Sequence, residues 1–316
     1  MRSIGLLGGR GYTGEALLSL LENHPDLEVA WVASRSLAGQ RVRDAFPGLS
    51  LDHAFQSLPP GPLPPSDVVV LALPNGVASS YLAELPQEQR VLDLSADYRF
   101  DEAWVYGLPE WNRAEIRRAT RIANPGCYAT AAQLALAPLR DRLSAAAPPV
   151  VYGVSGYSGA GRTPHPRNDP ERLRNNLLPY ALTGHVHEKE VSDRLGTDVR
   201  FTPHVASFFR GISATVSALL EKPTSSDALL GLYREAYRGE PLIEVSPSIP
   251  EVAHVASSPR AAIGGFAVDE RDPRRVTLVA CLDNLLKGAA SQALQNINLM
   301  LDLPERAGLS GAPEPS

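Results

Sequence analysis

The 316-residue sequence contains only two cysteines, Cys127 and Cys281, so it has neither a disulfide framework nor the paired cysteines of a zinc motif. It lacks any apolar run long enough to cross a bilayer. Basic runs are also absent, and the formal charge of −5 argues against a nucleic-acid-binding surface. The N-terminal residues Met1-Arg2-Ser3 lead directly into an apolar segment without the pattern of a signal peptide. We therefore expect a cytoplasmic protein that binds neither membrane nor nucleic acid.

The residues that are present suit a folded chain with room for two domains, with 44% hydrophobic and 21% charged residues. In the first third, apolar runs typical of buried strands alternate with segments of helical periodicity. Such alternation indicates a parallel sheet covered by helices. The expected strands are Ser3–Leu7, Val29–Ala33, Asp67–Leu73, Arg90–Leu94 and Arg121–Ala123, and the expected helices are Tyr12–Asn23 and Val77–Glu84.

The pattern changes after Cys127, where a helix to about Leu143 precedes the strand Val150–Ser155. A long loop rich in Gly, Pro and Arg follows and ends near Asn176. Longer β-patterned segments then predict a mixed sheet in a second domain, with one helix over Ser226–Tyr237. These segments are Val199–Ser207, Ile212–Leu220, Val252–Ala256, Ala262–Asp269 and Val276–Leu282.

Cys127 stands in the pentapeptide Asn124-Pro125-Gly126-Cys127-Tyr128, directly after a Pro-Gly turn and at the start of a helical pattern. A thiol in the first turn of a helix lies near unpaired N–H groups and the positive end of the dipole, and both favour the reactive thiolate. The alternative is that Cys127 is a small buried hydrophobic residue. The other cysteine lies in an apolar run and is better explained as part of a buried strand. Cys127 is therefore the candidate nucleophile.

The segment Gly8–Gly14 has the pattern of a strand end, a glycine turn and a helix start, with glycines at positions 8, 11 and 14. Glycines permit a tight turn and close backbone approach, and a helix N-terminus offers N–H groups to a pyrophosphate. Arg10 could add a contact or point to solvent. We expect a dinucleotide to bind at Gly8, Arg10, Gly11, Tyr12, Thr13 and Gly14.

The end of the second expected strand indicates which dinucleotide binds. An NAD site expects Asp or Glu there, to bind the ribose hydroxyls, but this chain has Ser34-Arg35-Ser36. A cationic fork flanked by hydroxyls suits a 2′-phosphate, so NADP(H) is favoured, and the alternative is a solvated surface arginine. Pro74 follows a long strand at the edge where the cofactor would pass, although it could equally be a turn former.

Two further clusters bear on the nucleophile. The segment Gly153–Arg162 ends a strand in a loop of small residues that should expose several backbone N–H groups, and such a loop can bind an anion or a developing oxyanion. In the second cluster, a carboxylate at Glu190 lies one helical turn beyond His187 and can hold it or His185 as a general acid/base. The alternatives are a flexible turn for the loop, and surface histidines or a metal site for the second cluster. No third group of ligands favours a metal.

With these motifs in order, the chain resembles the N-acetyl-γ-glutamyl-phosphate reductase family of the semialdehyde dehydrogenase superfamily. The matches run along nearly the whole sequence and are far more specific together than any one motif. They are Gly8–Glu15 (GGRGYTGE), Asp93–Arg99 (DLSADYR), Tyr106–Glu110 (YGLPE), Pro125–Leu134 (PGCYATAAQL), Ser155–Arg162 (SGYSGAGR), His185–Glu190, Phe201–His204 with Arg210-Gly211-Ile212, and Asp283–Ala289 (DNLLKGA). Gly9-Arg10, Ala129 and Val186 depart from the family's usual residues, and none of them removes a group that the chemistry needs.

The resemblance implies a mechanism. Cys127 would attack the acyl phosphate of N-acetyl-γ-glutamyl phosphate, expel phosphate and form a thioester, which NADPH would reduce to the semialdehyde. His185 would be the acid/base, with His187 as the alternative, and Glu190 would orient one of them.

The resemblance also assigns binding residues. Arg99 and Arg162 would bind the substrate carboxylate or phosphate, since a planar fork can grip two oxygens, and Ser155 would lie beside them. Asn284 and Lys287 would lie near the nicotinamide.

The architecture that the resemblance implies is α/β, with an N-terminal Rossmann-type parallel sheet and a second α+β domain built on a mixed sheet. Residues 1–126 plus 285–316 would form the NADP-binding domain, and residues 127–284 the catalytic and dimerisation domain. The last helix, about Leu285–Leu301, would pack on the first domain, and the tail Ala307–Ser316 would be mobile. A small-molecule acyl phosphate and a homodimer or homotetramer are expected. The alternatives are an aminoadipyl-phosphate reductase with a carrier-protein-bound substrate, a more distant aspartate-semialdehyde dehydrogenase, and an NADP-binding regulator without turnover.

Overall fold

The computed structural model describes residues 1–309, which form two compact units. Unit 1 consists of Met1–Gly126 together with the chain from Ala289 on, and unit 2 is Cys127–Gly288. Each unit is built on its own seven-stranded sheet. Within residues 1–309, no helix is both long and apolar enough to span a bilayer. The predicted mobile tail is Ala307–Ser316, and its residues 310–316 lie outside the described part of the chain.

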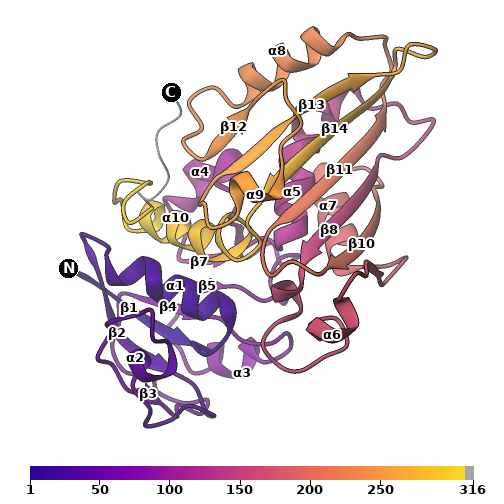
Figure 1. The fold of residues 1–316 in the computed structure, drawn as a ribbon. Coiled ribbons are helices and arrows are strands. Elements are labelled where there is room, and N and C mark those ends of the chain that lie inside the picture. The colour runs from indigo at the N-terminus through magenta and orange to yellow at the C-terminus, as the bar shows by residue number, and fades with distance from the viewer. Residues whose placement is uncertain (310–316) are drawn as a thin grey trace. The chain divides into compact units, whose positions relative to one another are not determined.

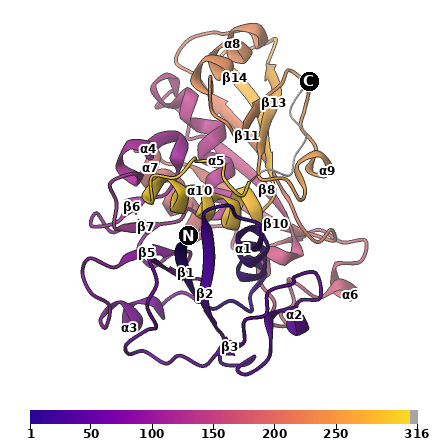
Figure 2. The ribbon, with the colours of Figure 1, turned by 90° about the vertical axis from the view of Figure 1, so that its left-hand side faces the viewer.

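The sheet of unit 1 is entirely parallel, which confirms the prediction for the first domain. Its strands are β1 (Arg2–Leu7), β2 (Leu27–Ala33), β3 (Phe55–Gln56), β4 (Val68–Leu71), β5 (Arg90–Asp93), β6 (Val105–Tyr106) and β7 (Arg121–Ala123). They follow the order β3-β2-β1-β4-β5-β7-β6, and Figure 2 shows β1 and β2 side by side. All four residues of β4 are buried, as expected when both faces of a sheet are covered. The strand order reverses between β1 and β4, so a ligand site is expected at their carboxyl ends.

The helices of unit 1 are α1 (Tyr12–Glu22), α2 (Val42–Ala45), α3 (Ala78–Leu82), α4 (Pro109–Ile116) and α10 (Ser291–Met300). As predicted, the C-terminal helix packs on the first domain, where α10 contacts α1 and α4. Asn296 and Asn298 of α10 are buried because they bond backbone groups of unit 1. The Asn296 amide donates to the Gly107 carbonyl (2.8 Å), and the Asn298 amide donates to the Ala307 carbonyl (2.9 Å). Burial of the two amide nitrogens is therefore compensated.

The last helix does not begin as one continuous α-helix from about Leu285, so this part of the prediction is wrong. Leu286–Ala290 form a π-helical turn (η3), and α10 follows it. The turn is widened because the Gly288 N–H donates to the Asp283 carbonyl, five residues back, at 2.9 Å.

The sheet of unit 2 is mixed, as predicted. Its strands are β8 (Val150–Gly156), β9 (Leu178–Pro179), β10 (Arg200–Ala206), β11 (Ile212–Leu219), β12 (Ile243–Val245), β13 (Ala261–Val268) and β14 (Arg275–Leu282), in the order β12-β13-β14-β11-β8-β10-β9. β14 is antiparallel to β13 and β11, whereas β8 and β10 are parallel. Along β11, buried residues alternate with partly or fully exposed ones, so one face of the sheet is covered and the other is open.

The covering helices of unit 2 are α5 (Cys127–Leu136), α7 (Val186–Leu195) and α8 (Ser226–Ala236), and Figure 1 shows α5 behind the strands. The predicted β segment Val252–Ala256 is wrong: Val252–Val255 form a helical turn, α9, in which the Ala256 N–H donates to the Val252 carbonyl at 2.9 Å. Val255 packs on Ala262 and Cys281 there, and apolar residues three apart suit a helical turn as well as a short strand. The predicted loop before Asn176 contains two short helices, η2 (Tyr157–Ala160) and α6 (Pro170–Leu173).

Candidate active site

Cys127 is the first residue of α5, and its side chain is partly exposed. The nine residues that follow it in the helix are all buried, so packing fixes the helix and with it the thiol. The first N–H groups of a helix lack intrahelical partners, which favours a thiolate beside them. Cys281, in contrast, is fully buried in β14, where its Sγ donates to the Pro250 carbonyl (3.4 Å) and burial raises its pKa. Of the two cysteines, Cys127 has the surroundings of a nucleophile.

Gly288 packs directly against this cysteine. A Cβ added at Gly288 would lie 2.7 Å from the Cβ of Cys127 and 3.2 Å from its Cα, well inside van der Waals contact. The π-helical turn brings the backbone of Gly288 to this position. A residue without a side chain is therefore required beside Cys127 for steric reasons.

The carboxylate of Asp283 holds that turn in place. It is fully buried and accepts hydrogen bonds from the N–H groups of Leu285 (2.8 Å), Leu286 (3.1 Å) and Ser257 (2.6 Å). The Nε of Arg210 lies 2.5 Å from its Oδ2. A buried carboxylate needs such partners to offset its desolvation, and the charge of Arg210 is neutralised in return.

Five rings form one aromatic cluster in unit 2: Tyr128, Tyr180, His185, His187 and Phe201. The ring centroid of Tyr128 lies 5.0 Å from that of Phe201 and 6.4 and 6.0 Å from those of the two histidines. Burial, and then the charges of Tyr180 and Cys127, raise the pKa of Tyr128 well above its usual range. Burial, and then the charge of Cys127, raise the pKa of Tyr180 to about 12. Tyr128 follows Cys127 directly in α5, so the nucleophile and the cluster belong to one site.

His185 is the N-cap of α7, and its Nδ1 accepts a hydrogen bond from the His187 backbone N–H at 3.1 Å. In the neutral ring the proton therefore lies on Nε2, which can donate. Burial, and then the charge of Arg167, lower the pKa of His185 to about 4, so the ring is neutral at physiological pH. The two histidine rings lie 4.8 Å apart. Their proximity leaves the choice of acid/base between His185 and His187 as a prediction.

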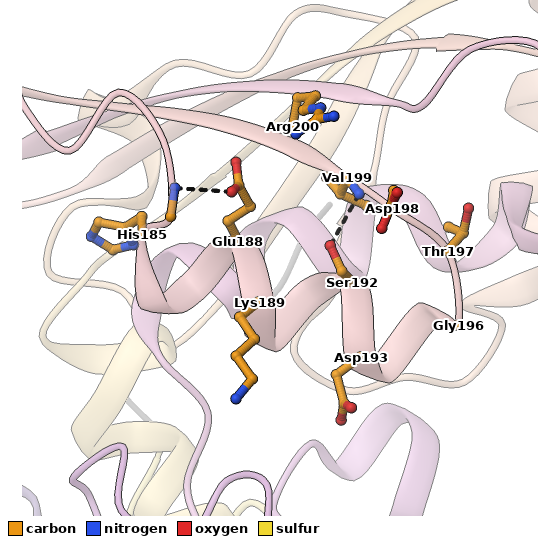
Figure 3. Close-up of a pocket in the computed structure, with 11 residues that line it drawn as sticks. His185, Glu188, Lys189, Ser192, Asp193, Gly196, Thr197, Asp198, Val199 and Arg200 are labelled. Atoms are coloured by element: carbon orange, nitrogen blue, oxygen red, sulfur yellow. Dashed lines mark hydrogen bonds between the residues drawn. The ribbon is translucent and has the colours of Figure 1, made fainter.

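Two glutamates of α7 occupy different environments. Glu190, which is predicted to orient a histidine, is fully buried, and this role stays a prediction. Glu188 accepts hydrogen bonds from the N–H groups of Gly184 (3.1 Å) and Phe201 (2.9 Å), which fastens the start of α7 to β10. Figure 3 shows Glu188 directed toward the strand that carries Arg200, beside a hollow of about 570 Å³ that extends along α7.

At the end of β8 and in the loop that follows, several backbone N–H groups already donate hydrogen bonds to backbone carbonyls. Four N–H groups donate to backbone carbonyls at 2.9–3.0 Å, those of Gly156, Tyr157, Ser158 and Gly161. The prediction that this loop exposes several N–H groups to an anion is therefore wrong for these four. Ser155 is buried and its hydroxyl donates to the Gly156 carbonyl (2.9 Å), whereas Arg162 is exposed. The substrate-binding roles of Ser155 and Arg162 stay predictions.

Asn284 joins two loops of unit 2. Its Oδ1 accepts from the Gly211 N–H (2.6 Å) and its Nδ2 donates to the Ser158 hydroxyl (2.9 Å), so both ends of the amide are used. Lys287 is fully buried in η3. The location of Asn284 and Lys287 near a nicotinamide stays a prediction.

Arg99 lies in unit 1 and is almost fully buried. Its Nε donates to the Asn124 carbonyl (2.9 Å), and a terminal nitrogen donates to the Leu94 carbonyl (3.1 Å). The Asn124 side chain in turn accepts from the Asn296 amide (3.0 Å). These bonds fix the segment that leads into Cys127, and the role of Arg99 in substrate binding stays a prediction.

A cavity of about 370 Å³ in unit 1 brings several predicted cofactor residues together at the carboxyl ends of β1, β2 and β4. Its lining includes Gly8, Arg10, Ser34, Arg35, Ser36 and Pro74. The hydroxyls of Ser34 and Ser36 lie 3.4 Å apart on either side of the exposed Arg35. Gly11 is the N-cap of α1, and Tyr12, Thr13 and Gly14 form its first turn. One end of the cavity is thus cationic and rich in hydroxyls.

The three glycines of this turn differ in whether the fold itself requires a residue without a side chain. Gly8 has a φ of +80°, and an added Cβ would lie 2.1 Å from the Ala72 carbonyl oxygen. A Cβ at Gly14 would lie 2.8 Å from the backbone of Gly9. Gly11 has an ordinary φ of −69°, and its Cβ would meet only the Gly8 carbonyl oxygen, at 3.8 Å. The fold therefore does not require glycine at position 11. The absence of a side chain there leaves space at the N-terminus of α1 for the close approach of a pyrophosphate, so the residues present fit a dinucleotide.

Two family descriptions match this chain. "Semialdehyde dehydrogenase, NAD binding domain" covers residues 3–119, and "Semialdehyde dehydrogenase, dimerisation domain" covers residues 127–284. A relative named N-acetyl-γ-glutamyl-phosphate reductase from Xanthomonas campestris pv. campestris is 49% identical over 308 residues, with 96% of each chain covered. The protein of the same name from Xylella fastidiosa is 48% identical over 318 residues, with 99% of this chain and 96% of its own covered.

Solved structures share the fold at low sequence identity. An aspartate semialdehyde dehydrogenase II from Vibrio cholerae, complexed with ASA, has a TM-score of 0.74 at 18% identity, with 96% of this chain and 98% of that chain covered. An aspartate semialdehyde dehydrogenase with NADP from Candida albicans has a TM-score of 0.74 at 17% identity, with 96% and 98% covered. At these identities the likeness concerns the fold alone.

Proposed function

The chain belongs to the semialdehyde dehydrogenase family, among its N-acetyl-γ-glutamyl-phosphate reductases, and we propose that it catalyses their reaction. That reaction is the NADPH-dependent reductive dephosphorylation of N-acetyl-γ-glutamyl phosphate to N-acetylglutamate semialdehyde, in arginine biosynthesis. The observation that carries the proposal is the setting of Cys127, a partly exposed thiol in the first turn of α5, against Gly288 and the aromatic cluster.

In the first half-reaction the Cys127 thiolate forms a bond to the acyl carbon, the bond from that carbon to the phosphate oxygen breaks, and a thioester remains. The N–H groups at the start of α5 favour the thiolate before attack. The neutral His185 donates from Nε2 to the carbonyl oxygen while negative charge develops on it. Because the phosphate leaves with the bonding electron pair, no oxidant or reductant is needed in this step.

Bound NADPH supplies the hydride that reduces the thioester. The turn Gly8–Gly14 and the N-terminus of α1 would hold its pyrophosphate, and Ser34-Arg35-Ser36 would hold its 2′-phosphate. The alkoxide that hydride addition leaves is stabilised by an N–H donor from one of the two histidines, and it reforms the carbonyl while the carbon–sulfur bond breaks and its electron pair passes to sulfur. The semialdehyde is released, and the thiolate of Cys127 is restored.

The two units divide the work in this proposal, with cofactor binding in unit 1 and the nucleophile in unit 2. We propose a homodimer or homotetramer, built on the open face of the unit 2 sheet, where Tyr152 is 54% exposed and residues 127–284 match a dimerisation domain. Sedimentation velocity of the purified chain measures this assembly directly, and a monomer would contradict it.

We place the enzyme in the cytoplasm, where a catalytic thiol stays reduced.

The reaction is tested in the reverse direction, as phosphate-dependent formation of NADPH from NADP⁺. We expect turnover with N-acetylglutamate semialdehyde and much slower turnover with free or carrier-bound aminoadipate semialdehydes. Preference for a carrier-bound aminoadipate semialdehyde would show that the substrate assignment is wrong and that the thioester mechanism still applies. Binding of NADPH without turnover on any of these aldehydes would instead favour a non-catalytic regulator.

Replacing Arg35 by glutamate should weaken NADPH binding by about 10- to 100-fold, because a charge-assisted contact to the 2′-phosphate is lost and a like charge replaces it. The affinity for NADH, which has no 2′-phosphate, should change little. Fluorescence titration of both nucleotides measures the two affinities. Arg118→Glu, at another exposed arginine of unit 1, makes the same charge change and should leave both affinities unaltered. Equal losses for NADPH and NADH in Arg35→Glu would remove Arg35 from the 2′-phosphate site.

A further inference from the structure

Arg167 carries a guanidinium group in unit 2 that has no carboxylate partner among residues 1–309. Its side chain is partly buried, and its guanidinium carbon lies 4.4 Å from the ring centroid of Tyr180. Its Nε makes only a long contact, 3.5 Å, to Nδ1 of His165. A guanidinium fork without a carboxylate partner is suited to an anion that arrives with a ligand.

The loop that carries Arg167 is built to hold it. The Asn168 amide donates to the carbonyls of Gly161 (2.7 Å) and Thr163 (2.8 Å), and its Oδ1 accepts from the His165 N–H (2.7 Å). The backbone N–H of Arg167 donates to Nδ1 of His165 (3.0 Å). These bonds close the loop on itself, and the cation–π contact then fixes the guanidinium over Tyr180.

The position of Arg167 connects it with the nucleophile. The ring of Tyr180 lies 5.5 Å from that of His185, and the His185 ring lies 6.4 Å from that of Tyr128, the residue that follows Cys127 in α5. The charge of Arg167 itself acts on His185. Arg210, another arginine of unit 2, already pairs with Asp283. Arg167 is therefore a positive charge in the Cys127 site that no acidic residue described in the structure offsets.

We propose that Arg167 is a specificity-determining residue that binds the carboxylate of the acyl substrate, away from the carbon that Cys127 attacks. This inference rests on the proposed reaction. The carboxylate stays with the acyl group through both half-reactions, whereas the phosphate leaves after the first, so a permanent cation serves the carboxylate throughout. The contact with Tyr180 holds the guanidinium carbon 4.4 Å from the ring centroid, and the planar fork of a guanidinium matches the two oxygens of a carboxylate.

The test compares two aldehydes that differ only in this carboxylate: N-acetylglutamate semialdehyde and its decarboxylated analogue, 4-acetamidobutanal. Both are assayed with phosphate and NADP⁺. Arg167→Gln should lower kcat/KM for the charged aldehyde by about 10- to 100-fold and leave that for the neutral one nearly unchanged, since only the charged substrate loses a bidentate contact. Arg167→Lys should recover part of the loss, because it restores the charge without the fork.

Arg172→Gln serves as the matched control, because Arg172 is an exposed arginine of the same loop region, and it should leave both aldehydes unaffected. An equal loss on both aldehydes, with a raised KM for phosphate, would assign Arg167 to the phosphate and overturn the carboxylate assignment. Wild-type discrimination in Arg167→Gln would also overturn it while leaving the reaction intact. Absence of turnover in the wild-type enzyme would contradict the proposed reaction itself, and this inference with it.

Discussion

Replacing Cys127 by serine should lower phosphate-dependent oxidation of N-acetylglutamate semialdehyde by about 10⁴-fold or more, because the nucleophile acts in every step of the reaction. A serine hydroxyl has nearly the size of the thiol, but at neutral pH it is not ionised and forms an ester in place of the thioester. The nine buried residues that follow in α5 keep their packing, so the fold and NADPH binding should remain close to wild type. Steady-state rates and fluorescence titration with NADPH measure the two quantities.

Cys281→Ser is the matched control, since Cys281 lies in the core of unit 2. Its hydroxyl can still donate to the Pro250 carbonyl, so turnover should stay near wild type while the free energy of unfolding falls by about 1 kcal/mol. Iodoacetamide, which alkylates thiolates, should modify the wild type and Cys281→Ser at one site and fail to modify Cys127→Ser. Wild-type turnover in Cys127→Ser would show that another group attacks the substrate.

Five of the seven strands of unit 1 could be predicted from the sequence because each contains a short apolar run, whereas β3 and β6, of two residues each, are too short to show a pattern. Val68–Leu71 is buried on both faces, so nothing in its composition competes with the strand assignment. Val252–Val255 shows the limit of such patterns. Two valines three positions apart fit a turn of helix and a strand equally, and their packing on Ala262 and Cys281 decides for the helix.

Site residues could be predicted from the sequence where a local motif indicates their role, as for Cys127 after a Pro-Gly turn. They could not be predicted where the role depends on contacts between side chains that only the tertiary fold brings together. Tyr180 and Arg167 belong to no periodic pattern, and their connection with Cys127 depends on β9 pairing with β10 and on the closed loop before α6. The same limit applies to the N–H groups of Gly156, Tyr157 and Ser158, which the sequence suggests are available. In the structure they donate to carbonyls of the segment Phe208–Gly211.

Gly288→Ala should lower turnover by about 100-fold, because the added methyl group conflicts with the nucleophile. That methyl would lie 2.7 Å from the Cβ of Cys127 and 3.2 Å from the Asp283 carbonyl oxygen, so either the nucleophile or the turn must move. A displacement of about 1 Å at a reacting atom costs about 100-fold in rate. Overpacking of this kind also lowers the free energy of unfolding by about 1–3 kcal/mol. Rates of semialdehyde oxidation and of Cys127 alkylation report the displacement, and denaturant unfolding reports the stability.

Gly231→Ala gives the matched control, because Gly231 lies in the middle of α8, is exposed, and would place its methyl with no atom within 4 Å. This change should raise the free energy of unfolding by about 0.5–1 kcal/mol, since alanine favours the helix, and should leave turnover unchanged. Opposite signs in stability would separate steric conflict at Gly288 from the general effect of adding a methyl group. If Gly288→Ala lost stability but kept wild-type turnover and alkylation rates, the turn would yield without moving the thiol, and Gly288 would serve the fold rather than the position of Cys127.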